Sequence, residues 1–454
     1  MNLPNYFLAD LPPEATPSAA MIADACQTLK HNREQYLAAR STQSLINLLS
    51  EVADNWMQPV YPIRVMALEQ GPAATGFSKA TLARGLDTFF KQLTPENFHA
   101  LLTQDLGHIQ RLDEPVATNP ELKLNRGGMA RGPEFIFHIA AGNIPNPTLT
   151  SIALGVLTRS AQFVKCGSGA SFIPRLFAHS LYEVDAKAAS CLEIAEWRGG
   201  NHALEEVLFA EADCITATGS DETLDKIRHH LPARKRFLSY GHRVSYGYVT
   251  GESLTGFAAK KIITRAADDV TAWDQNGCLS PHVIYVEHGG GVSAEQFAEM
   301  LAEELARREE IEPRGTLSVE QAATIASRRA FYEVRAAHAP ESTRHWFSEG
   351  STAWTVVYEA DPRFQMSCLN RFIYVKGVSD LTHALQSVDE LRGKISTVGL
   401  AAPEHRAQEM VAQLTRWGVT RVCPLGQMQN PPLLWRHDGR PGLGDLVTWT
   451  DWEQ

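Results

Sequence analysis

Apolar segments of strand length alternate with amphipathic segments of helix length between residues 135 and 249. The strand candidates are rich in Ile, Val, Phe and Thr, and the segments between them repeat apolar residues at helical spacing. Such alternation is typical of a parallel sheet with helices on both faces, because each parallel crossover needs a helix to return the chain. The strand candidates are Phe135–Ala140, Gln162–Lys165, Cys191–Glu196, Asp213–Thr218 and Ser245–Val249, and the helix candidates are Leu149–Thr158, Ile173–Val184, His202–Ala210 and Glu222–His230. The pattern predicts a doubly wound α/β domain with its ligand site at the carboxyl ends of the strands.

The length of 454 residues is enough for two domains. Residues 15–110 read as mostly helical, and a second mixed region begins near Leu254 and runs to about Trp417. The segment Lys123–Gly132 is rich in Gly, Arg and Asn, which indicates a turn or a hairpin arm. We expect a helical region and a first α/β domain over residues 1–253, a second α/β domain over 254–418, and a C-terminal return segment over 419–454.

Composition and charge narrow the class of protein. A formal net charge of −10 argues against nucleic acid or an anionic membrane as the main partner. The seven cysteines are scattered, with no Cys-x-x-Cys pair and no metal-ligand spacing, so we expect a reduced, cytoplasmic protein without a metal site. Residues 135–157 carry no charged side chain, but Pro145 and Pro147 interrupt them, so we expect no membrane span. The first residues also lack the basic segment and apolar core of a secretory signal.

Cys278 lies in the segment Trp273–Pro281, which has the composition of a loop between two regular elements. Residues 258–272 before it read as an amphipathic helix, and residues 282–287 after it read as a buried strand. A thiol at such a junction, with backbone N–H groups around it, is a candidate nucleophile. The alternative is that Cys278 is a small buried apolar side chain. For the neighbouring His282 we favour a core histidine over a group that titrates with the thiol.

Polar residues follow three of the predicted strands where each strand ends. Asn143 follows the first strand, Lys165 ends the second, and Gly219 and Ser220 follow the fourth and open a helix. Backbone N–H groups at a helix N-terminus favour a pyrophosphate. The alternatives are a plain helix cap by Ser220, a Lys165 ammonium that extends to the surface, and an Asn143 that only caps its loop. No G-x-G-x-x-G motif is present, so the usual dinucleotide fingerprint does not support the site.

Taken in order, Asn143, Lys165, Gly219-Ser220 and Cys278 resemble the site residues of the aldehyde dehydrogenase superfamily, at similar intervals of 22, 54 and 58 residues. Three further segments resemble its acyl-CoA reductase branch, the fatty acid reductase component of bacterial luminescence systems. They are Ala-Ala-Gly-Asn-Ile-Pro (140–145), Asp-Gln-x-x-Cys-x-Ser-Pro (274–281) and the tail over 421–447. The resemblance extends over roughly residues 120 to 450. It implies an aldehyde dehydrogenase-like α/β fold with a doubly wound NADP-binding domain, an α/β catalytic domain and a small arm for oligomerisation.

The resemblance also implies roles for these residues. Cys278 would be the nucleophile and Asn143 would assist the oxyanion, while Lys165 would contact the cofactor ribose and Gly219 with Ser220 the pyrophosphate. The implied reaction is the NADPH-dependent reduction of a fatty acyl-CoA or other acyl thioester to the aldehyde through a thioacyl-enzyme on Cys278. The luminescence family further implies an acyl-protein synthetase as partner and a homo-oligomeric assembly.

The choice between NADPH and NADH depends on two positions. Ser168 stands where NAD-preferring members often carry a Glu that would repel a 2′-phosphate, and Arg198 could supply a cation for that phosphate. Glu193 and Glu196 lie near Arg198 in the sequence and could pair with it instead. We therefore expect NADPH, with NADH as the alternative.

Three different functions compete with acyl thioester reduction. A hydrolytic aldehyde dehydrogenase would need the Glu that activates water, but residues 239–243 at the corresponding place carry no carboxylate. The Glu of a second superfamily motif is also not recognisable, although Glu359 and Gln365 lie nearby. The second competing function is a Cys-dependent acyltransferase without redox chemistry, and the third is a non-catalytic subunit that keeps the fold.

Overall fold

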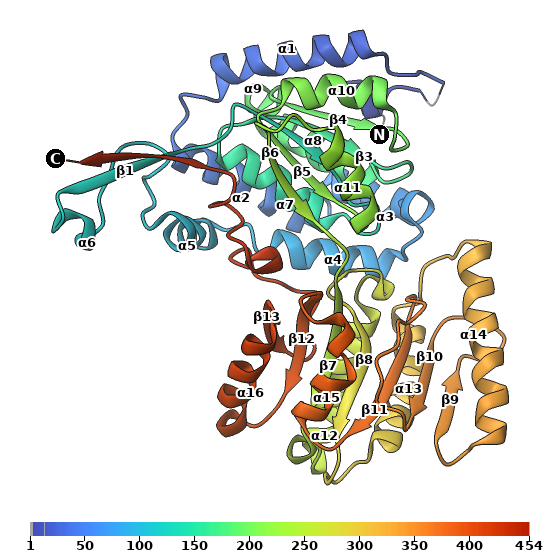
Figure 1. The fold of residues 1–454 in the computed structure, drawn as a ribbon. Coiled ribbons are helices and arrows are strands. Elements are labelled where there is room, and N and C mark those ends of the chain that lie inside the picture. Colours follow the sequence, from blue (N-terminus) through green and yellow to red (C-terminus); the bar gives the residue numbers. More distant parts are fainter. Residues whose placement is uncertain (1–2, 13, 454) are drawn as a thin grey trace. The chain divides into compact units, whose positions relative to one another are not determined.

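The computed structural model describes residues 3–12 and 14–453 of the chain. The chain forms two compact units, each built around its own sheet (Figure 1). The first unit comprises the chain up to residue 75 together with residues 86–241 and 432–454, and the second comprises residues 76–85 and 242–431. The units therefore divide at residues 241 and 431, where the sequence led us to expect divisions at 253 and 418.

The first unit contains a five-stranded parallel sheet in the order β4-β3-β2-β5-β6. Alternate residues of the central strand β2 face opposite sides. Phe135 and Phe137 pack with apolar residues of α1 and α10, whereas Ile136 packs with those of α2, α7 and α8. Helices thus cover both faces, as the doubly wound prediction requires. The strands are β2 (Phe135–Ile139), β3 (Ala161–Cys166), β4 (Leu192–Glu196), β5 (Cys214–Thr218) and β6 (Arg236–Tyr240).

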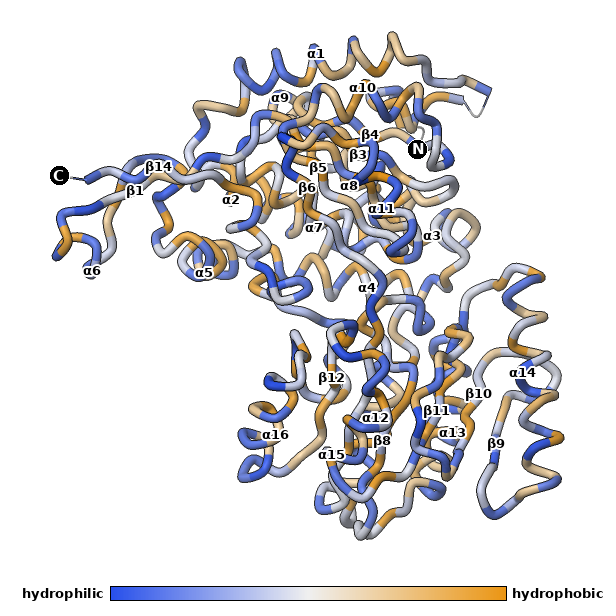
Figure 2. Tube along the Cα trace, in the orientation of Figure 1, coloured by the Kyte–Doolittle hydropathy of each residue, from blue (hydrophilic) through white to orange (hydrophobic). Residues whose placement is uncertain are grey.

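The helices of the first unit follow the alternation read from the sequence from α7 onwards. They are α1 (Ala19–Tyr36), α2 (Thr42–Met57), α3 (Pro62–Thr75), α4 (Lys79–Phe90, whose first half is counted with the second unit), α5 (Pro95–Leu106), α6 (Asn119–Leu122), α7 (Asn146–Leu157), α8 (Phe172–Val184), α9 (Ala186–Ala189), α10 (His202–Glu211) and α11 (Asp221–His230). Hydrophobic residues concentrate along the strands, while α11 is largely hydrophilic (Figure 2).

The expected arm is a strand, β1 (Arg126–Arg131), that pairs with the end of the chain. Its antiparallel partner is β14 (Thr448–Glu453), which lies beside β1 (Figure 2). The register places Arg126 opposite Glu453. A local hairpin is therefore wrong for this segment, because the partner strand lies more than three hundred residues later in the sequence. The tail packs on the first unit, where Leu443 and Leu446 are buried in the core.

The second unit contains a seven-stranded sheet in the order β13-β12-β7-β8-β11-β10-β9, in which only β9 runs antiparallel to its neighbour. Its strands are β7 (Val244–Val249), β8 (Pro281–Glu287), β9 (Thr343–Phe347), β10 (Thr355–Glu359), β11 (Phe372–Val378), β12 (Ile395–Ala401) and β13 (Arg421–Pro424). Its helices are α12 (Gly256–Thr271), α13 (Ala294–Ile311), α14 (Val319–His338), α15 (Leu381–Ser387) and α16 (Glu404–Trp417).

One strand placement from the sequence is wrong. Ser245–Val249 was expected in the first sheet, but β7 pairs with β12 and β8 of the second sheet. The composition of the strand could not show this, because pairing partners are set by contacts far apart in the sequence. Tyr246 and Tyr248 are fully buried in the core of the second unit, which fixes the strand there.

No helix of residues 3–12 and 14–453 is long and apolar enough to span a membrane.

A buried carboxyl group in the second unit gives a prediction about stability. Asp269 of α12 is 1% exposed and accepts hydrogen bonds from the backbone N–H groups of Gly426 (2.5 Å) and Met428 (2.8 Å). Burial raises the pKa of Asp269 to about 7. Between about pH 4 and pH 7 the native state therefore holds a proton that the unfolded state has released, so stability falls as the pH rises through this window. We expect the free energy of unfolding of Asp269→Asn to decrease less over this window than that of the wild type, as measured by urea unfolding between pH 4 and pH 8.

This prediction would be contradicted if the free energy of unfolding changed with pH at the same slope in the wild type and in Asp269→Asn. Glu193→Gln is a matched comparison in the first unit, because burial also raises the pKa of Glu193 to about 7.

Candidate active site

The carboxyl edge of the first sheet brings together the residues that the sequence singled out in this unit. The chain passes from β2 outward to β3 and β4, and then returns to place β5 on the other side of β2. Ligands of open α/β sheets bind beside such a reversal of strand order. Asn143 lies on the exposed loop after β2, and Gly219 and Ser220 follow β5, so these residues flank the reversal.

Lys165 is the second-last residue of β3 and is only 6% exposed. Burial lowers the pKa of its ammonium group, and the nearby Glu205 carboxylate opposes this shift. A Cβ atom on Gly199 would lie 3.6 Å from the Lys165 Nζ atom, so the lysine points along the edge of the sheet toward this glycine. The alternative of a lysine that extends to the surface is therefore wrong.

Ser220 caps α11, because its Oγ atom accepts a hydrogen bond from the Thr223 N–H at 3.3 Å. The Gly219 N–H donates to the Tyr240 carbonyl oxygen at 3.1 Å, so this amide is not open as the sequence suggested. Asp221 and Glu222 occupy the first turn of α11 and add negative charge there. The N-terminus of α11 and Ser220 would attract an anion at this turn, whereas the two carboxylates would repel it.

The turn after β3 carries Ser168, which is exposed. The Glu196 carboxylate accepts hydrogen bonds from the backbone N–H groups of Gly169 (2.7 Å) and Ser171 (3.2 Å). A negative charge thus lies beside Ser168, although residue 168 itself carries none.

Arg198 is exposed, and the two glutamates that could have paired with it have other partners. Glu193 accepts hydrogen bonds from the backbone N–H groups of Leu8 (2.7 Å) and Ile194 (3.0 Å), and Glu196 holds the turn after β3. In the part of the chain that the structure describes, neither carboxylate forms an ion pair with Arg198.

Glycines leave room along the same edge. A Cβ atom added to Gly142, Gly167, Gly169 or Gly200 would meet no atom within 4 Å. Together with the Lys165 ammonium and the N-terminus of α11, this open rim fits the phosphates and ribose of a dinucleotide.

Cys278 lies in the second unit, on the loop between α12 and β8, and is half-buried. Its carbonyl oxygen accepts a hydrogen bond from the Ser245 Oγ atom at 2.9 Å, and the same Oγ accepts from the Thr397 N–H at 3.2 Å. Gln429 Nε2 donates to the Ser280 Oγ atom of the same loop at 2.6 Å. Hydrogen bonds therefore hold the loop at the Cys278 carbonyl group and at the Ser280 side chain.

Other cysteines in the chain fit the alternative of a small buried apolar side chain. Cys26, Cys166, Cys191 and Cys214 are fully buried, and burial raises the pKa of each thiol to about 12. Such thiols stay protonated and unreactive at neutral pH. Cys278 differs from these four cysteines in that its side chain is only half-buried.

His282 has the environment of a core histidine. It is 6% exposed, and its Nδ1 atom accepts a hydrogen bond from the Ser367 N–H at 3.2 Å. Burial lowers the pKa of His282 to about 4, so the ring is neutral at physiological pH. The interpretation favoured from the sequence is confirmed.

Glu359 is remote from Cys278 within the second sheet. It is the last residue of β10, whereas Cys278 comes before the first residue of β8, and β8, β11 and β10 run parallel. The Glu359 carboxylate lies 3.2 Å from the Lys376 Nζ atom and 3.2 Å from an Arg335 nitrogen. It is thus a buried structural carboxylate at the opposite edge of the sheet.

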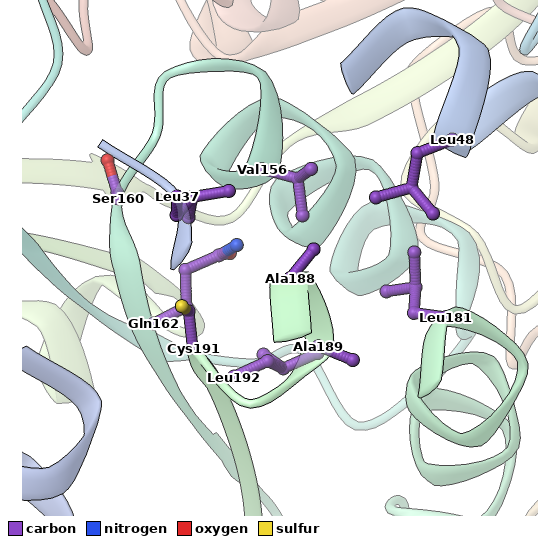
Figure 3. A pocket seen from close by; sticks show the side chains of 10 residues that line it. All are labelled: Leu37, Leu48, Val156, Ser160, Gln162, Leu181, Ala188, Ala189, Cys191 and Leu192. Atoms are coloured by element: carbon purple, nitrogen blue, oxygen red, sulfur yellow. The ribbon is translucent and has the colours of Figure 1, made fainter. Parts of the chain in front are cut away.

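A small cavity in the core of the first unit does not add to the site (Figure 3). Its volume is about 10 Å³, which is room for about one water molecule, and its lining is mostly apolar, including Leu48, Val156 and Leu181. A fatty acyl chain needs a space many times larger. The cavity is therefore a packing void.

Sequence reasoning did not identify the side chains that support the Cys278 loop. Ser245 and Gln429 contact the loop from β7 and from the segment after β13, and Arg371, just before β11, contacts Asp274 at the entry to the loop. Only their long-range contacts single them out, since Ser, Gln and Arg are common at exposed positions.

Known proteins resemble this chain in sequence and in fold. A long-chain acyl-protein thioester reductase of Aliivibrio fischeri is 24% identical over 421 residues, which cover 90% of this chain and 82% of the relative. Among solved structures, the aldehyde dehydrogenase PutA of Anabaena variabilis has a TM-score of 0.71 at 14% identity and covers 96% of this chain and 93% of its own. Proline utilization A of Bradyrhizobium japonicum has a TM-score of 0.73 at 13% identity, and this chain spans less than half of that protein (96% and 45% covered). The structural likeness establishes an aldehyde dehydrogenase fold.

The family model described as acyl-CoA reductase (LuxC) matches residues 37–449, which is most of the chain and includes both units. The chain belongs to the acyl-CoA reductase (LuxC) family.

Proposed function

We propose that this protein reduces a long-chain acyl thioester, carried by CoA or by a protein, to the aldehyde with NADPH. The observation that carries the proposal is the half-buried Cys278, held on a braced loop in a chain whose family is that of acyl-CoA reductases. The relative from Aliivibrio fischeri is named a long-chain acyl-protein thioester reductase, which supports an acyl thioester as substrate.

In the proposed mechanism, the Cys278 thiolate attacks the thioester carbonyl carbon and a new C–S bond forms. The oxyanion accepts hydrogen bonds from the Asn143 side-chain amide and the Cys278 backbone N–H, and it collapses as the C–S bond to the acyl carrier breaks. The carrier leaves as a thiolate, and the acyl group remains on Cys278 as a thioester. NADPH, when bound, supplies the hydride that reduces this thioester carbonyl. The thiohemiacetal on Cys278 then breaks its C–S bond and releases the aldehyde and the thiolate.

The cofactor would bind at the carboxyl edge of the first sheet. Lys165 would donate to its ribose, and Gly219 with Ser220 would receive the pyrophosphate at the start of α11. The open positions at Gly142 and Gly167 leave space for it. No carboxylate occurs at residues 239–243 to activate water, which favours hydride transfer over hydrolysis of the thioacyl-enzyme.

Cofactor preference provides a prediction. Arg198 is exposed and can turn to a 2′-phosphate, so we expect Arg198→Ala to lower kcat/KM for NADPH about 10-fold with little effect on NADH. Ser168→Glu should shift the preference further toward NADH, because it adds a second carboxylate beside Glu196. Steady-state kinetics with both cofactors measure the shift.

Arg234→Ala is the matched control, since Arg234 is an exposed arginine of the same unit. If the ratio of kcat/KM for NADPH to kcat/KM for NADH is unchanged in both the Arg198→Ala and the Ser168→Glu proteins, these two residues do not select NADPH.

We further propose a cytoplasmic homo-oligomer that works with an acyl-protein synthetase. The resemblance to the luminescence family supports the partner, and the exposed strand β14 with Trp449 and Trp452 supports assembly through the arm. Light scattering would give the mass of the assembly, and titration with an acyl-protein synthetase would test the partner.

The decisive experiment mixes the purified protein with NADPH and a panel of acyl-CoA and acyl-protein thioesters. We expect NADPH oxidation with stoichiometric aldehyde, abolished by prior alkylation of Cys278. Acyl transfer without NADPH oxidation would instead indicate an acyltransferase, and NADPH formation from aldehyde and NADP⁺ with release of free acid would indicate the hydrolytic dehydrogenase.

A further inference from the structure

Two three-residue stretches of left-handed backbone lie in the second unit. Trp273, Asp274 and Gln275 have φ values of 51°, 48° and 64°. The second stretch consists of Leu369, Asn370 and Arg371, with φ values of 59°, 54° and 65°. Non-glycine residues rarely adopt this conformation, and three in succession persist only where the surroundings hold them. We refer to these stretches as the 273–275 turn and the 369–371 turn.

A buried ion pair joins the two turns. Arg371 Nε donates to Asp274 Oδ1 at 2.8 Å, and Arg371 Nη2 lies 2.7 Å from the same oxygen. The side chains of Arg371 and Asp274 are 1% and 4% exposed. Asn276 Nδ2 adds a second link by donating to Asn370 Oδ1 at 3.2 Å. The two turns are therefore held against each other by charge and by hydrogen bonds.

Each member of the ion pair is anchored elsewhere in the second unit. Asp274 Oδ2 accepts a hydrogen bond from the Gly315 N–H at 3.1 Å. Arg371 Nη1 donates to Glu309 Oε2 at 3.0 Å and to the Glu312 carbonyl oxygen at 2.9 Å. Loss of Arg371 would leave the buried Asp274 carboxylate without this cation, and loss of Asp274 would leave Arg371 with Glu309 as its remaining carboxylate partner.

The 273–275 turn leads directly into the Cys278 loop. Gln275 Nε2 donates to the Pro281 carbonyl oxygen at 2.7 Å and to the Phe372 carbonyl oxygen at 2.9 Å. These bonds close the loop from residue 275 to residue 281 at its base, next to the start of β11, with Cys278 in its middle. The direction in which the loop leaves α12 is thus set by the left-handed turn.

We propose that Asp274 and Arg371 are positioning residues, whose ion pair locks the two left-handed turns together and so aims the Cys278 thiol. The proposal rests on the assignment of Cys278 as the nucleophile in the proposed function. A shift of the thiol by about 1 Å is enough to cost on the order of 10²-fold in rate. The ion pair is therefore expected to matter for reactivity beyond its contribution to stability.

The test uses Asp274→Asn, which keeps the shape of the side chain and removes its charge. We expect the alkylation rate of Cys278 by iodoacetamide, followed on the Cys278 peptide by mass spectrometry, to change about 10-fold, and kcat to fall on the order of 10²-fold. The affinity for NADPH, measured by fluorescence, should stay the same, because the cofactor residues belong to the other unit.

Asp113→Asn is the matched control. Asp113 forms an ion pair with Arg159, which is also left-handed (φ 57°), in the first unit. This control should lower the melting temperature without changing Cys278 alkylation. An equal change in alkylation from Asp113→Asn would overturn the proposal, because the effect would then follow from any loss of stability.

Asn370→Gly provides the second variant in case Asp274→Asn does not fold. Glycine accepts the left-handed backbone without strain, while the link to Asn276 is lost. We expect a folded protein whose Cys278 alkylation rate changes by about 3-fold. Wild-type alkylation rates in every folded variant overturn the proposal. The alkylation readout needs no acyl substrate, so it decides this inference separately from the outcome of the acyl thioester assay.

Discussion

Replacement of Cys278 by Ala is expected to lower the rate of acyl thioester reduction by about 10⁴-fold or more. In the proposed mechanism the thiol forms the covalent bond to the acyl group, so its loss removes the group that attacks the thioester. Cys278→Ser should be almost as inactive, because a hydroxyl group ionises far less readily than a thiol at neutral pH. The measurement is single-turnover aldehyde formation, with trapping of the acyl-enzyme by mass spectrometry.

The control for this prediction is Cys423→Ala. Cys423 is half-buried like Cys278, and burial raises the pKa of its thiol to about 12, so it is not a nucleophile at neutral pH. The control should keep most of its activity and should still form an acyl-enzyme. A Cys278→Ala protein that reduces acyl thioesters at the wild-type rate would end the proposed mechanism.

The sequence predicted the first sheet well because its strands are marked locally. Phe135–Ala140 and Gln162–Lys165 correspond closely to β2 and β3, since short apolar runs between helices admit few other structures. Ser245–Val249 carries the same local signal, yet it pairs in the second sheet. The left-handed turn over residues 369–371 likewise delays the start of β11 to Phe372. Local pattern identifies a strand, and long-range contacts decide its partners and limits.

The candidate site divides in the same way. Lys165 and Ser220 could be found because they stand at strand ends, where parallel sheets bind ligands. The residues that support the Cys278 loop could not be found in this way, because they are far from it in the sequence. Arg371 contacts Asp274 across 97 positions, and Gln429 contacts Ser280 across 149 positions. No pattern of residue types marks such pairs in a single sequence. The left-handed turn over 273–275 was also not visible in the sequence, since Trp and Gln rarely adopt that backbone and a single Asp does not mark it.

Asn143→Ala is expected to lower kcat by about 10²–10³-fold, because the proposed mechanism then loses one hydrogen-bond donor to the oxyanion. Asn143 lies on an exposed loop, so the fold should be unaffected. Asn143→Asp should be at least as damaging, since a carboxylate would repel the developing negative charge. The acylation rate of Cys278 by an acyl thioester, measured by rapid quench, reports the effect on the first chemical step.

Alkylation by iodoacetamide separates this role from a general effect on the thiol. That displacement forms no oxyanion, so Cys278 of Asn143→Ala should be alkylated at the wild-type rate while its acylation is slow. Asn201→Ala, at an exposed asparagine of the same unit, should change neither rate. If acylation of Asn143→Ala proceeds at the wild-type rate, Asn143 does not stabilise the oxyanion. If acylation and alkylation slow together, the asparagine acts on the thiol itself, and the oxyanion then depends on backbone N–H groups alone.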